Sequence, residues 1–407
     1  MRIAIVNACH PERQHVCAFR GTTFAEILTD SGNQVLLLTP PLTQTGKGIG
    51  KADLKEKLKI HNWSTYCQVT GGFIDKSILP SVRKGRVPTP IRQGIIAYNY
   101  LLRGNIYNDW IAPSSTLLPV IADDFKPDIV WTIFGNSSCW KMGQALAHTA
   151  GCPWVADIKD NWQAFIPKGL RETTAQKFRD AAAYTVLSQA HADTFPLSSP
   201  SDFKIVYNGI SPALMKATKN KTNVSDLREE ILITGSLYRS DILAQLLQAI
   251  NAWQQQNPGT NISYAGGDKE ILEQAMSSLD NAVDVKNLGS LVPHDLWERQ
   301  QNVRINVYVR NPPNLFHHKL LELLAAGRPI LAYPGETDES QAIAKSVKGV
   351  FFACADQKQI HQALDQAQST SRFLPDKAAL NQFSSQHQAG RLVELFAETT
   401  KRCASSS

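Results

Sequence analysis

The sequence has few cysteines and no long apolar run. Its 407 residues include seven cysteines, none of which forms a Cys-x-x-Cys pair. Neither a disulfide framework nor a zinc site of the usual spacing is therefore expected. The longest apolar segments, such as 242–250, fall well short of the roughly 20 residues that a membrane-spanning helix needs. The segment 1–12 lacks the apolar stretch of a signal peptide. These absences predict a cytoplasmic protein with reduced, buried thiols and no structural metal.

Glycine-rich phosphate loops are also absent. No Gly-x-Gly-x-x-Gly motif follows the strand-like segments 2–7 and 230–236. A nicotinamide-dependent dehydrogenase of the Rossmann type needs that turn beside the pyrophosphate of its cofactor. The loop after the first segment contains no glycine before Gly21. The sequence therefore disfavours this class of enzyme.

The overall composition is that of an ordinary folded protein. Hydrophobic residues make up 43% of the chain and charged residues 19%, which is sufficient for a large buried core. At roughly 100 to 200 residues per domain, a chain of 407 residues predicts two domains or three small ones.

Strand-like and helix-like segments alternate along both halves of the chain. Apolar runs such as 2–7 and 127–134 alternate with helical patterns in the first half, and the second half repeats this order from 230–236 to 357–369. Such alternation is typical of α/β folds in which helices cover both faces of a parallel sheet. We predict two doubly wound, Rossmann-like domains. The expected divisions are 1–198, 199–375, and a C-terminal helix at 376–407 that packs back on the first domain.

Positive charge is concentrated in one region. The net charge is +6, and positions 42–109 hold 11 Lys and Arg against 4 Asp and Glu. This pattern favours a local anionic partner over a uniformly basic nucleic-acid-binding protein. A solvated surface explains the lysines of 46–59 equally well. The aromatic residues of the region are Trp63, Tyr98, Tyr100, Tyr107 and Trp110. We therefore expect peripheral contact with an anionic membrane, at its inner face, as one use of this region.

The segment 317–335 is the most informative part of the sequence for function. A helical pattern there leads directly into Gly327 and a buried strand. The N-terminus of such a helix is an anion site. Lys319 adds a cation in its first turn, and Glu322 follows on the same helix face. A carboxylate beside a phosphate site fits the hydroxyls of a nucleotide ribose. The alternative is an ordinary surface Glu–Lys pair.

Several segments resemble one enzyme family. The segment 319–331, KLLELLAAGRPIL, is similar to the donor-site helix of the retaining glycosyltransferases of family 4. The other similar segments are 127–162, which contains DIKDNW, 204–214, KIVYNGISPAL, 231–239, ILITGSLYR, and 381–396, NQFSSQHQAGRLVELF. The resemblance spans nearly the whole chain. It implies the GT-B fold, in which two Rossmann-like domains face each other across a cleft and the C-terminal helix crosses back to the N-terminal domain.

The resemblance assigns a nucleotide-sugar donor site to the second domain. It places Glu322 on the donor ribose and Arg239 and Lys319 on the diphosphate. The family's second acid falls on Asn314, which is an amide here, and the basic residue that commonly follows Arg239 is replaced by Ser240 and Asp241. The remaining donor-site positions implied by the resemblance are Gly235, Ser236, Tyr238, His318 and Leu288.

The first domain supplies the candidates for acceptor binding and catalysis. Asp160 lies just after a strand in DIKDNW, where it can bind sugar hydroxyls or accept a proton. Its alternative role is to cap the next helix. His10 follows the first strand and is a further catalytic candidate, together with Asn314. Asn136 and Trp162 are the expected acceptor-binding residues.

The resemblance implies an activity. It implies transfer of a hexose-type sugar from a nucleotide-diphosphate sugar to an acceptor hydroxyl, with retention and without a metal or other cofactor. A glycan, a lipid-linked molecule or a small molecule is the expected acceptor, in polysaccharide or glycoconjugate biosynthesis of the bacterial type. The alternatives are a sugar-nucleotide epimerase and a catalytically weak or silent nucleotide-sugar-binding protein, which the loss of the acid at Asn314 would permit.

Overall fold

The structure is a computed structural model in which two compact units are described separately. The first unit comprises Met1–Asn208 and Gln388–Ser407, and the second comprises Gly209–His387. The described residues are 1–13, 15–43, 46–74, 77–103, 105–197, 203–217, 227–279, 283–311, 313–370, 373 and 375–406.

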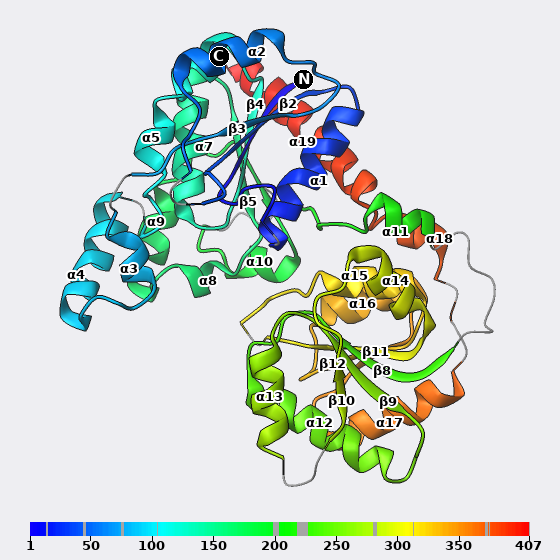
Figure 1. The fold of residues 1–407 in the computed structure, drawn as a ribbon. Coiled ribbons are helices and arrows are strands. Elements are labelled where there is room, and N and C mark those ends of the chain that lie inside the picture. Colours follow the sequence, from blue (N-terminus) through cyan, green and yellow to red (C-terminus); the bar gives the residue numbers. More distant parts are fainter. Residues whose placement is uncertain are drawn as a thin grey trace. The chain divides into compact units, whose positions relative to one another are not determined.

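The first unit is built on a seven-stranded sheet in which every neighbouring pair of strands is parallel (Figure 1). Its order is β3-β2-β1-β4-β5-β6-β7. The strands are β1 (Arg2–Asn7), β2 (Gln34–Thr39), β3 (Cys67–Thr70), β4 (Ile129–Ile133), β5 (Trp154–Ile158), β6 (Ala183–Val186) and β7 (Phe203–Ile205). Strands β4, β5 and β6 are buried along their whole length, as expected where helices cover both faces of a parallel sheet.

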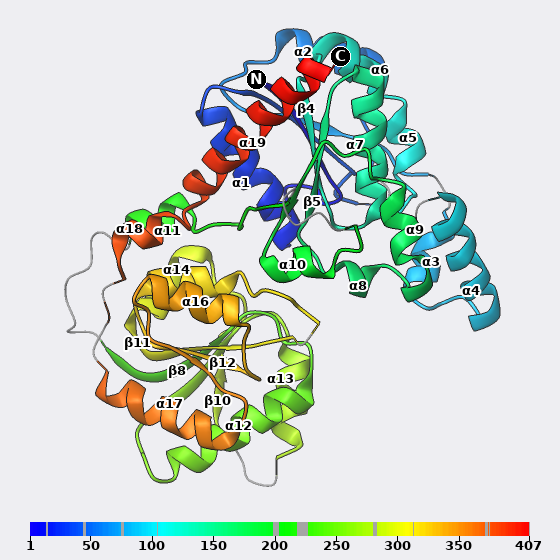
Figure 2. The same cartoon turned by 180° about the vertical axis from the view of Figure 1, so that it is seen from behind.

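Helices cover both faces of this sheet. They are α1 (Val16–Asp30), α2 (Lys51–Ile60), α3 (Leu79–Arg83), α4 (Thr89–Tyr98), η1 (Asn99–Arg103), α5 (Ile111–Ser115), α6 (Leu118–Val120), η2 (Ile121–Phe125), α7 (Ser137–Ala150), α8 (Trp162–Phe165), η3 (Lys168–Leu170), α9 (Arg171–Gln176), α10 (Gln189–Thr194) and most of α19 (Ser385–Ser406). Figures 1 and 2 show α1 and α19 on one face and α7 on the other. Phe24 of α1 and Phe396 of α19 both contact Trp131 of β4 edge-on.

The second unit has a six-stranded sheet, again with parallel pairs, in the order β10-β9-β8-β11-β12-β13. Its strands are β8 (Arg228–Thr234), β9 (Asn261–Ala265), β10 (Val285–Asn287), β11 (Val303–Val309), β12 (Ile330–Tyr333) and β13 (Phe351–Ala353). Its helices are α11 (Pro212–Ala217), α12 (Ser240–Gln254), α13 (Lys269–Ser277), α14 (Pro293–Asn302), α15 (Lys319–Ala326), α16 (Asp338–Ser346), α17 (Gln357–Ser369) and α18 (Lys377–Asn381). The prediction of two doubly wound α/β halves is confirmed.

The division between the units differs in position from the expected one. The expected boundary after residue 198 lies outside the described residues. The first unit extends to Asn208, because β7 pairs with β6 and completes the first sheet. At the other end, residues 376–387 stay with the second unit. The crossing back begins at Gln388, whose side chain accepts a hydrogen bond of 3.0 Å from the backbone N–H of Tyr207.

Candidate functional site

The second unit brings a glycine and a lysine together at the carboxyl end of its sheet. Gly235 follows β8 with φ +102°, and a Cβ built there would lie 3.0 Å from Cε of Lys319 and 3.8 Å from its Nζ. The lysine chain therefore runs directly over the Gly235 backbone. Because β8 and the N-terminus of α15 meet here, Gly235 and Lys319, two donor residues predicted from the sequence, are neighbours although they lie far apart in the chain.

The N-terminus of α15 is a region of positive potential. The helix has eight residues, no side chain hydrogen-bonds to its N-terminal N–H groups, and His318 occupies the N-cap position. The backbone N–H groups of Leu320 and Leu321 donate to the carbonyls of His317 and His318, at 3.0 and 3.2 Å, and the first turn of the helix carries the positive end of the dipole. Within the described part of the chain, Lys319 forms no ion pair with a carboxylate. A positive site is therefore preserved in the unliganded protein.

Glu322 lies three residues further along the same helix. Its carboxyl is partly buried, and burial raises its pKa above the ordinary value, while the charge of Lys319 opposes that rise. None of the described residues forms a hydrogen bond with this carboxylate. A buried carboxylate without donors is unfavourable. Its two oxygens are thus left for hydroxyl donors of a ligand.

Three further side chains of the site were not anticipated from the sequence. His317 stacks on Tyr308 with ring centroids 4.5 Å apart, and its Nδ1 has no hydrogen-bond partner in the described structure. Burial lowers the pKa of His317 well below its usual value, and the charges of His318, Lys319 and Arg310 lower it further. The imidazole of His317 is therefore neutral, chiefly because it is buried.

Arg310 is the second cation of this region. It follows β11 directly, lies 3.5 Å from the buried carboxylate of Glu336, and donates weakly to the backbone oxygen of Asn314 at 3.5 Å. The hydroxyl of Tyr308 donates to the same Glu336 at 2.8 Å. An arginine immediately after the buried segment VRINVYV was the sequence signal available for it, since ligands of parallel sheets bind at such strand ends.

The loops after β8 and β9 are held rigidly. The hydroxyl of Tyr264 donates to the carbonyl of Gly235 at 3.0 Å, and Asp268 accepts from the backbone N–H of Leu237 at 2.8 Å. A Cβ on Gly266 would come within 2.1 Å of the Tyr264 hydroxyl. The Gly235 turn is therefore fixed before any ligand arrives.

The other predicted donor residues have varied surroundings. Arg239 is exposed and forms an ion pair with Asp241, so a diphosphate would have to compete with that carboxylate. Ser236 and Tyr238 are exposed beside it. Leu288 packs against the small apolar cluster of Leu232, Ala265 and Val303. The side-chain amide of Asn314 makes no hydrogen bond to another described residue, so it remains available to a ligand.

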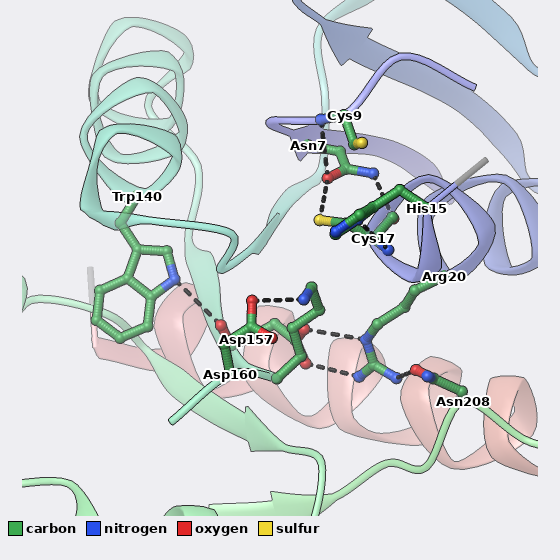
Figure 3. Close-up of polar contacts among 10 residues, drawn as sticks. Asn7, Cys9, His15, Cys17, Arg20, Trp140, Asp157, Asp160 and Asn208 are labelled. Carbon is green, nitrogen blue, oxygen red and sulfur yellow. Dashed lines mark hydrogen bonds and ion pairs between the residues drawn. The ribbon is translucent and has the colours of Figure 1, made fainter. Parts of the chain in front are cut away.

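In the first unit, two thiols and an asparagine organise the loop between β1 and α1. The buried side chain of Asn7 donates to the carbonyl of Cys17 at 2.9 Å and accepts from the Cys17 thiol at 3.2 Å and from the backbone N–H of Cys9 at 3.3 Å (Figure 3). A hydrogen bond with Cys17 lowers the pKa of the Cys9 thiol to about 7. A Cβ on Gly21 would lie 2.4 Å from Asn7 Nδ2. Side-chain hydrogen bonds therefore hold this loop without a glycine turn.

A buried ion pair ties α1 to β5. The guanidinium of Arg20 donates to both carboxylate oxygens of Asp157, at 2.7 and 3.0 Å, and to Asn208 at 2.9 Å (Figure 3). Both charged side chains are completely buried. The Thr185 hydroxyl also donates to Asp157, at 2.6 Å. Because both of its oxygens accept hydrogen bonds from buried side chains, Asp157 has a structural role.

The catalytic candidates of the first unit are both held by neighbours. Asp160 accepts from the buried ammonium of Lys159 at 2.5 Å. It does not cap α8, because the side chain that accepts from the Gln163 N–H is that of Asn161; the capping alternative was wrong. His10 is buried, its Nδ1 accepts from the Glu12 N–H at 3.3 Å, and its Nε2 lies 2.8 Å from the Gln68 amide.

Of the two acceptor-binding candidates, one lines a cavity and the other is buried in the core. Asn136 caps α7 and lines a cavity of about 280 Å³, together with Tyr100, Asn105, Tyr107, Ser137 and Phe165. Trp162 is completely buried among Phe134, Trp140 and Phe195. The expectation that Trp162 contacts an acceptor is therefore corrected, because its ring is part of the core.

Among the described residues, no helix is long and apolar enough to cross a membrane. The same residues contain no group of three or more His, Cys, Asp or Glu side chains placed to hold a metal ion. All seven cysteines lie in the described structure without a disulfide, and five of them are buried.

Comparisons with solved structures find similar folds over nearly the whole chain. A glycosyltransferase from Rickettsia africae superposes with a TM-score of 0.65 at 13% identity, covering 98% of each chain. Anabaena HepE in complex with UDP gives 0.61 at 13% identity, covering 98% of this chain and 100% of that one. A putative UDP-N-acetylglucosamine 2-epimerase from Listeria monocytogenes gives 0.57 at 10% identity, covering 96% and 94%.

Comparisons with protein families and with curated protein sequences find no match. The structural similarity shows the fold alone at these identities. The chain has the two-domain GT-B fold, in agreement with the expectation from the sequence.

Proposed function

We propose that this chain is a glycosyltransferase that moves a sugar from a nucleoside-diphosphate sugar to an acceptor hydroxyl. The observation that carries the proposal is the cluster of Gly235, Lys319 and Glu322 at the N-terminus of α15. It combines a cation, the positive end of a helix dipole and a carboxylate that lacks donors. The cation and the helix N-terminus complement a diphosphate, and the carboxylate complements the hydroxyls of a ribose.

In this proposal the second unit stabilises the leaving diphosphate. Negative charge develops on that group as the bond to the sugar breaks, and preorganised donors stabilise such charge strongly. Lys319 is the proposed donor, assisted by the positive end of the α15 dipole, with Arg310 and Arg239 as further cations. Glu322 orients the ribose by accepting from its hydroxyls. We propose retention of anomeric configuration and no requirement for a metal, on the strength of the family resemblance and of these cations.

The first unit is proposed to bind the acceptor. The cavity beside Asn136 offers aromatic walls and amide groups, a combination that suits a sugar ring. Its volume of about 280 Å³ is sufficient for one sugar-sized group. Asp160 and His10 are the proposed groups for positioning or deprotonating the acceptor hydroxyl. We propose a glycan or lipid-linked molecule as the acceptor, which places the enzyme in polysaccharide or glycoconjugate biosynthesis.

Epimerisation of the nucleotide sugar is the second candidate. One observation favours it: similar structures include a putative UDP-N-acetylglucosamine 2-epimerase and a UDP-GlcNAc 2-epimerase. The amide at position 314, where the family 4 pattern has an acid, instead permits a protein that is catalytically silent. A protein that binds the nucleotide sugar without turnover would share the same donor site.

The test is incubation of the protein with a panel of nucleotide sugars, starting with UDP-glucose and UDP-N-acetylglucosamine, with and without glycan acceptors. Release of nucleoside diphosphate and a glycosylated acceptor support transfer. A changed sugar on an intact nucleotide indicates epimerisation, and binding without change indicates a silent protein.

Glu322→Ala is expected to abolish turnover, whereas Glu270→Ala, a change at an exposed glutamate of the same unit, leaves it intact. No binding of any nucleotide sugar would overturn the proposal. Addition of EDTA tests metal independence, because turnover should persist.

A further inference from the structure

We propose that residues 77–103 of the first unit form a membrane-docking arm that lies in the headgroup region of an anionic bilayer. The arm consists of α3, the turn at 84–88, α4 and η1. Figures 1 and 2 show α3 and α4 next to each other at the margin of the first unit, away from its sheet. The inference concerns the arm itself and does not depend on the donor site.

The arm is unusually exposed for a helical segment of a folded unit. None of the ten residues of α4 is buried. Of the thirteen large hydrophobic residues that are exposed in the described structure, five belong to the arm, namely Ile78, Ile91, Tyr98, Leu101 and Leu102. Contiguous exposed apolar surface of this kind marks an interaction site.

Apolar residues of α4 and η1 follow helical spacing. Ile91, Ile95, Tyr98 and Leu102 are separated by four, three and four positions, so they fall on one face of α4 and its continuation into η1. Ile91 is 59% exposed and Leu102 is 68% exposed. An amphipathic helix normally turns such a stripe toward the core, but in this one Ile91, Tyr98 and Leu102 are exposed and Ile95 alone is half-buried.

The charges of the arm have one sign. Residues 77–103 contain five Lys and Arg and no Asp or Glu. Arg83 is engaged with Asp109 at 2.8 Å. The other four, Lys84, Arg86, Arg92 and Arg103, form no ion pair in the described structure. An apolar stripe flanked by unpaired cations is the composition of a helix that lies in a membrane interface.

The charge and the apolar stripe of the arm together favour an anionic membrane as its partner. Phosphate headgroups of anionic lipids attract the cations, and the acyl boundary accepts Ile91 and Leu102. A second copy of this chain would bring the same cations against one another and is therefore disfavoured. A nucleic acid would satisfy the cations but leave the apolar stripe in water.

The arm leads directly into the cavity of the first unit. Tyr100 of η1 lines that cavity, and its hydroxyl donates to the carbonyl of Phe165 at 3.0 Å. A docked arm would hold the cavity mouth close to the lipid surface. This consequence favours a lipid-linked acceptor and rests on the proposed function. The docking of the arm on a membrane does not depend on that function.

The test is sedimentation of the full-length protein with vesicles of phosphatidylcholine alone and of phosphatidylcholine with phosphatidylglycerol. We expect binding to the anionic vesicles, weakened by salt. The double variants Ile91→Ser/Leu102→Ser and Lys84→Glu/Arg86→Glu should each lower the affinity about ten-fold or more. All four side chains are exposed or partly exposed, so folding should be preserved, which circular dichroism checks. The control Ile60→Ser, at a residue of the same unit that is 72% exposed, should bind as wild type does.

Three results would overturn the inference. They are failure of the wild type to bind anionic vesicles at low salt, equal binding to neutral vesicles, and undiminished binding of both double variants. Size-exclusion chromatography adds a fourth: a wild-type dimer that Ile91→Ser/Leu102→Ser converts to monomer would assign the face to a second copy. Nucleotide binding is measured on the same variants and should be unchanged, so that failure of docking is distinguished from failure of the proposed function.

Discussion

The side chain of Lys319 crosses the backbone of Gly235, with its Cε 3.0 Å from the position that a Cβ would occupy. This contact joins the loop after β8 to the N-terminus of α15. It leaves the ammonium 3.8 Å from the same position, at the end of the helix where an anion is stabilised. The proposed donor site depends on this relationship.

Gly235→Ala should weaken nucleotide binding. The new methyl group would press on Lys319, and the φ of +102° would add strain of roughly 1 kcal/mol or more. The matched control is Gly259→Ala, since Gly259 has a φ of +98° and no atom within 4 Å of the Cβ position. Both variants should lose similar stability in urea unfolding, but only Gly235→Ala should raise the Kd for nucleoside diphosphates. Equal affinities would mean that the contact is irrelevant to binding.

Glu322→Gln should stabilise the unliganded protein and weaken its binding of nucleotide. Because burial raises the pKa of this carboxyl in the folded state, the folded protein disfavours the charged form, and stability falls as pH rises through the folded pKa. At neutral pH the neutral amide removes that penalty, so Tm should increase. The same change removes the charged acceptor for ribose hydroxyls, with a loss of about ten-fold in affinity. A lower Tm together with unchanged affinity would contradict both parts.

Asp157→Asn should strongly destabilise the first unit. The change leaves the completely buried Arg20 guanidinium without its counter-charge, which costs about 3–5 kcal/mol. The control is Asp124→Asn in the same unit, whose partner Lys55 lies 3.8 Å away with 70% of its side chain exposed; its effect should be about 0–1 kcal/mol. Urea unfolding followed by circular dichroism measures both. Similar losses in the two variants would argue against a structural role for the buried pair.

Acid should destabilise the first unit through His191. Burial and the charges of Lys159 and Arg20 lower the pKa of His191 from 6.5 to about 3. On acidification the unfolded chain takes up this proton first, so stability is complete above the unfolded pKa and is lost as pH falls toward the folded one. Between about pH 6 and 4 this group should contribute a slope near 1.4 kcal/mol per pH unit. His191→Gln should flatten the measured dependence, whereas the exposed His148→Gln should leave it in place.

Periodicity and turn chemistry in the sequence were sufficient for the fold. Buried strands such as Ile129–Ile133 alternate with helices that end at glycine, as α7 does at Gly151 and α15 at Gly327, and these signals are local. The boundary near Asn208 was not readable in the same way, because the membership of β7 in the first sheet is decided by its pairing with β6.

Part of the candidate site could be predicted from the sequence, again because some of its residues are close together along the chain. Lys319 and Glu322 share one helix, so their spacing already places them together. Arg310, His317 and Glu336 meet only through the fold, and no spacing rule joins them. For Trp162 the prediction was wrong. A tryptophan beside a strand end suggested a ligand contact, but Phe134, Trp140 and Phe195, which come from three separate segments of the chain, enclose its ring in the core.

The most direct test of the account is calorimetric titration of uridine, guanosine, adenosine and cytidine diphosphates into the wild-type protein, Lys319→Ala and Lys345→Ala. Lys345 is an exposed lysine of the second unit and controls for the loss of a positive charge. The account predicts that at least one nucleoside diphosphate binds the wild type and Lys345→Ala alike, and binds Lys319→Ala about ten-fold or more weakly. Absence of binding for all four nucleotides, or equal affinity for wild type and Lys319→Ala, would contradict it.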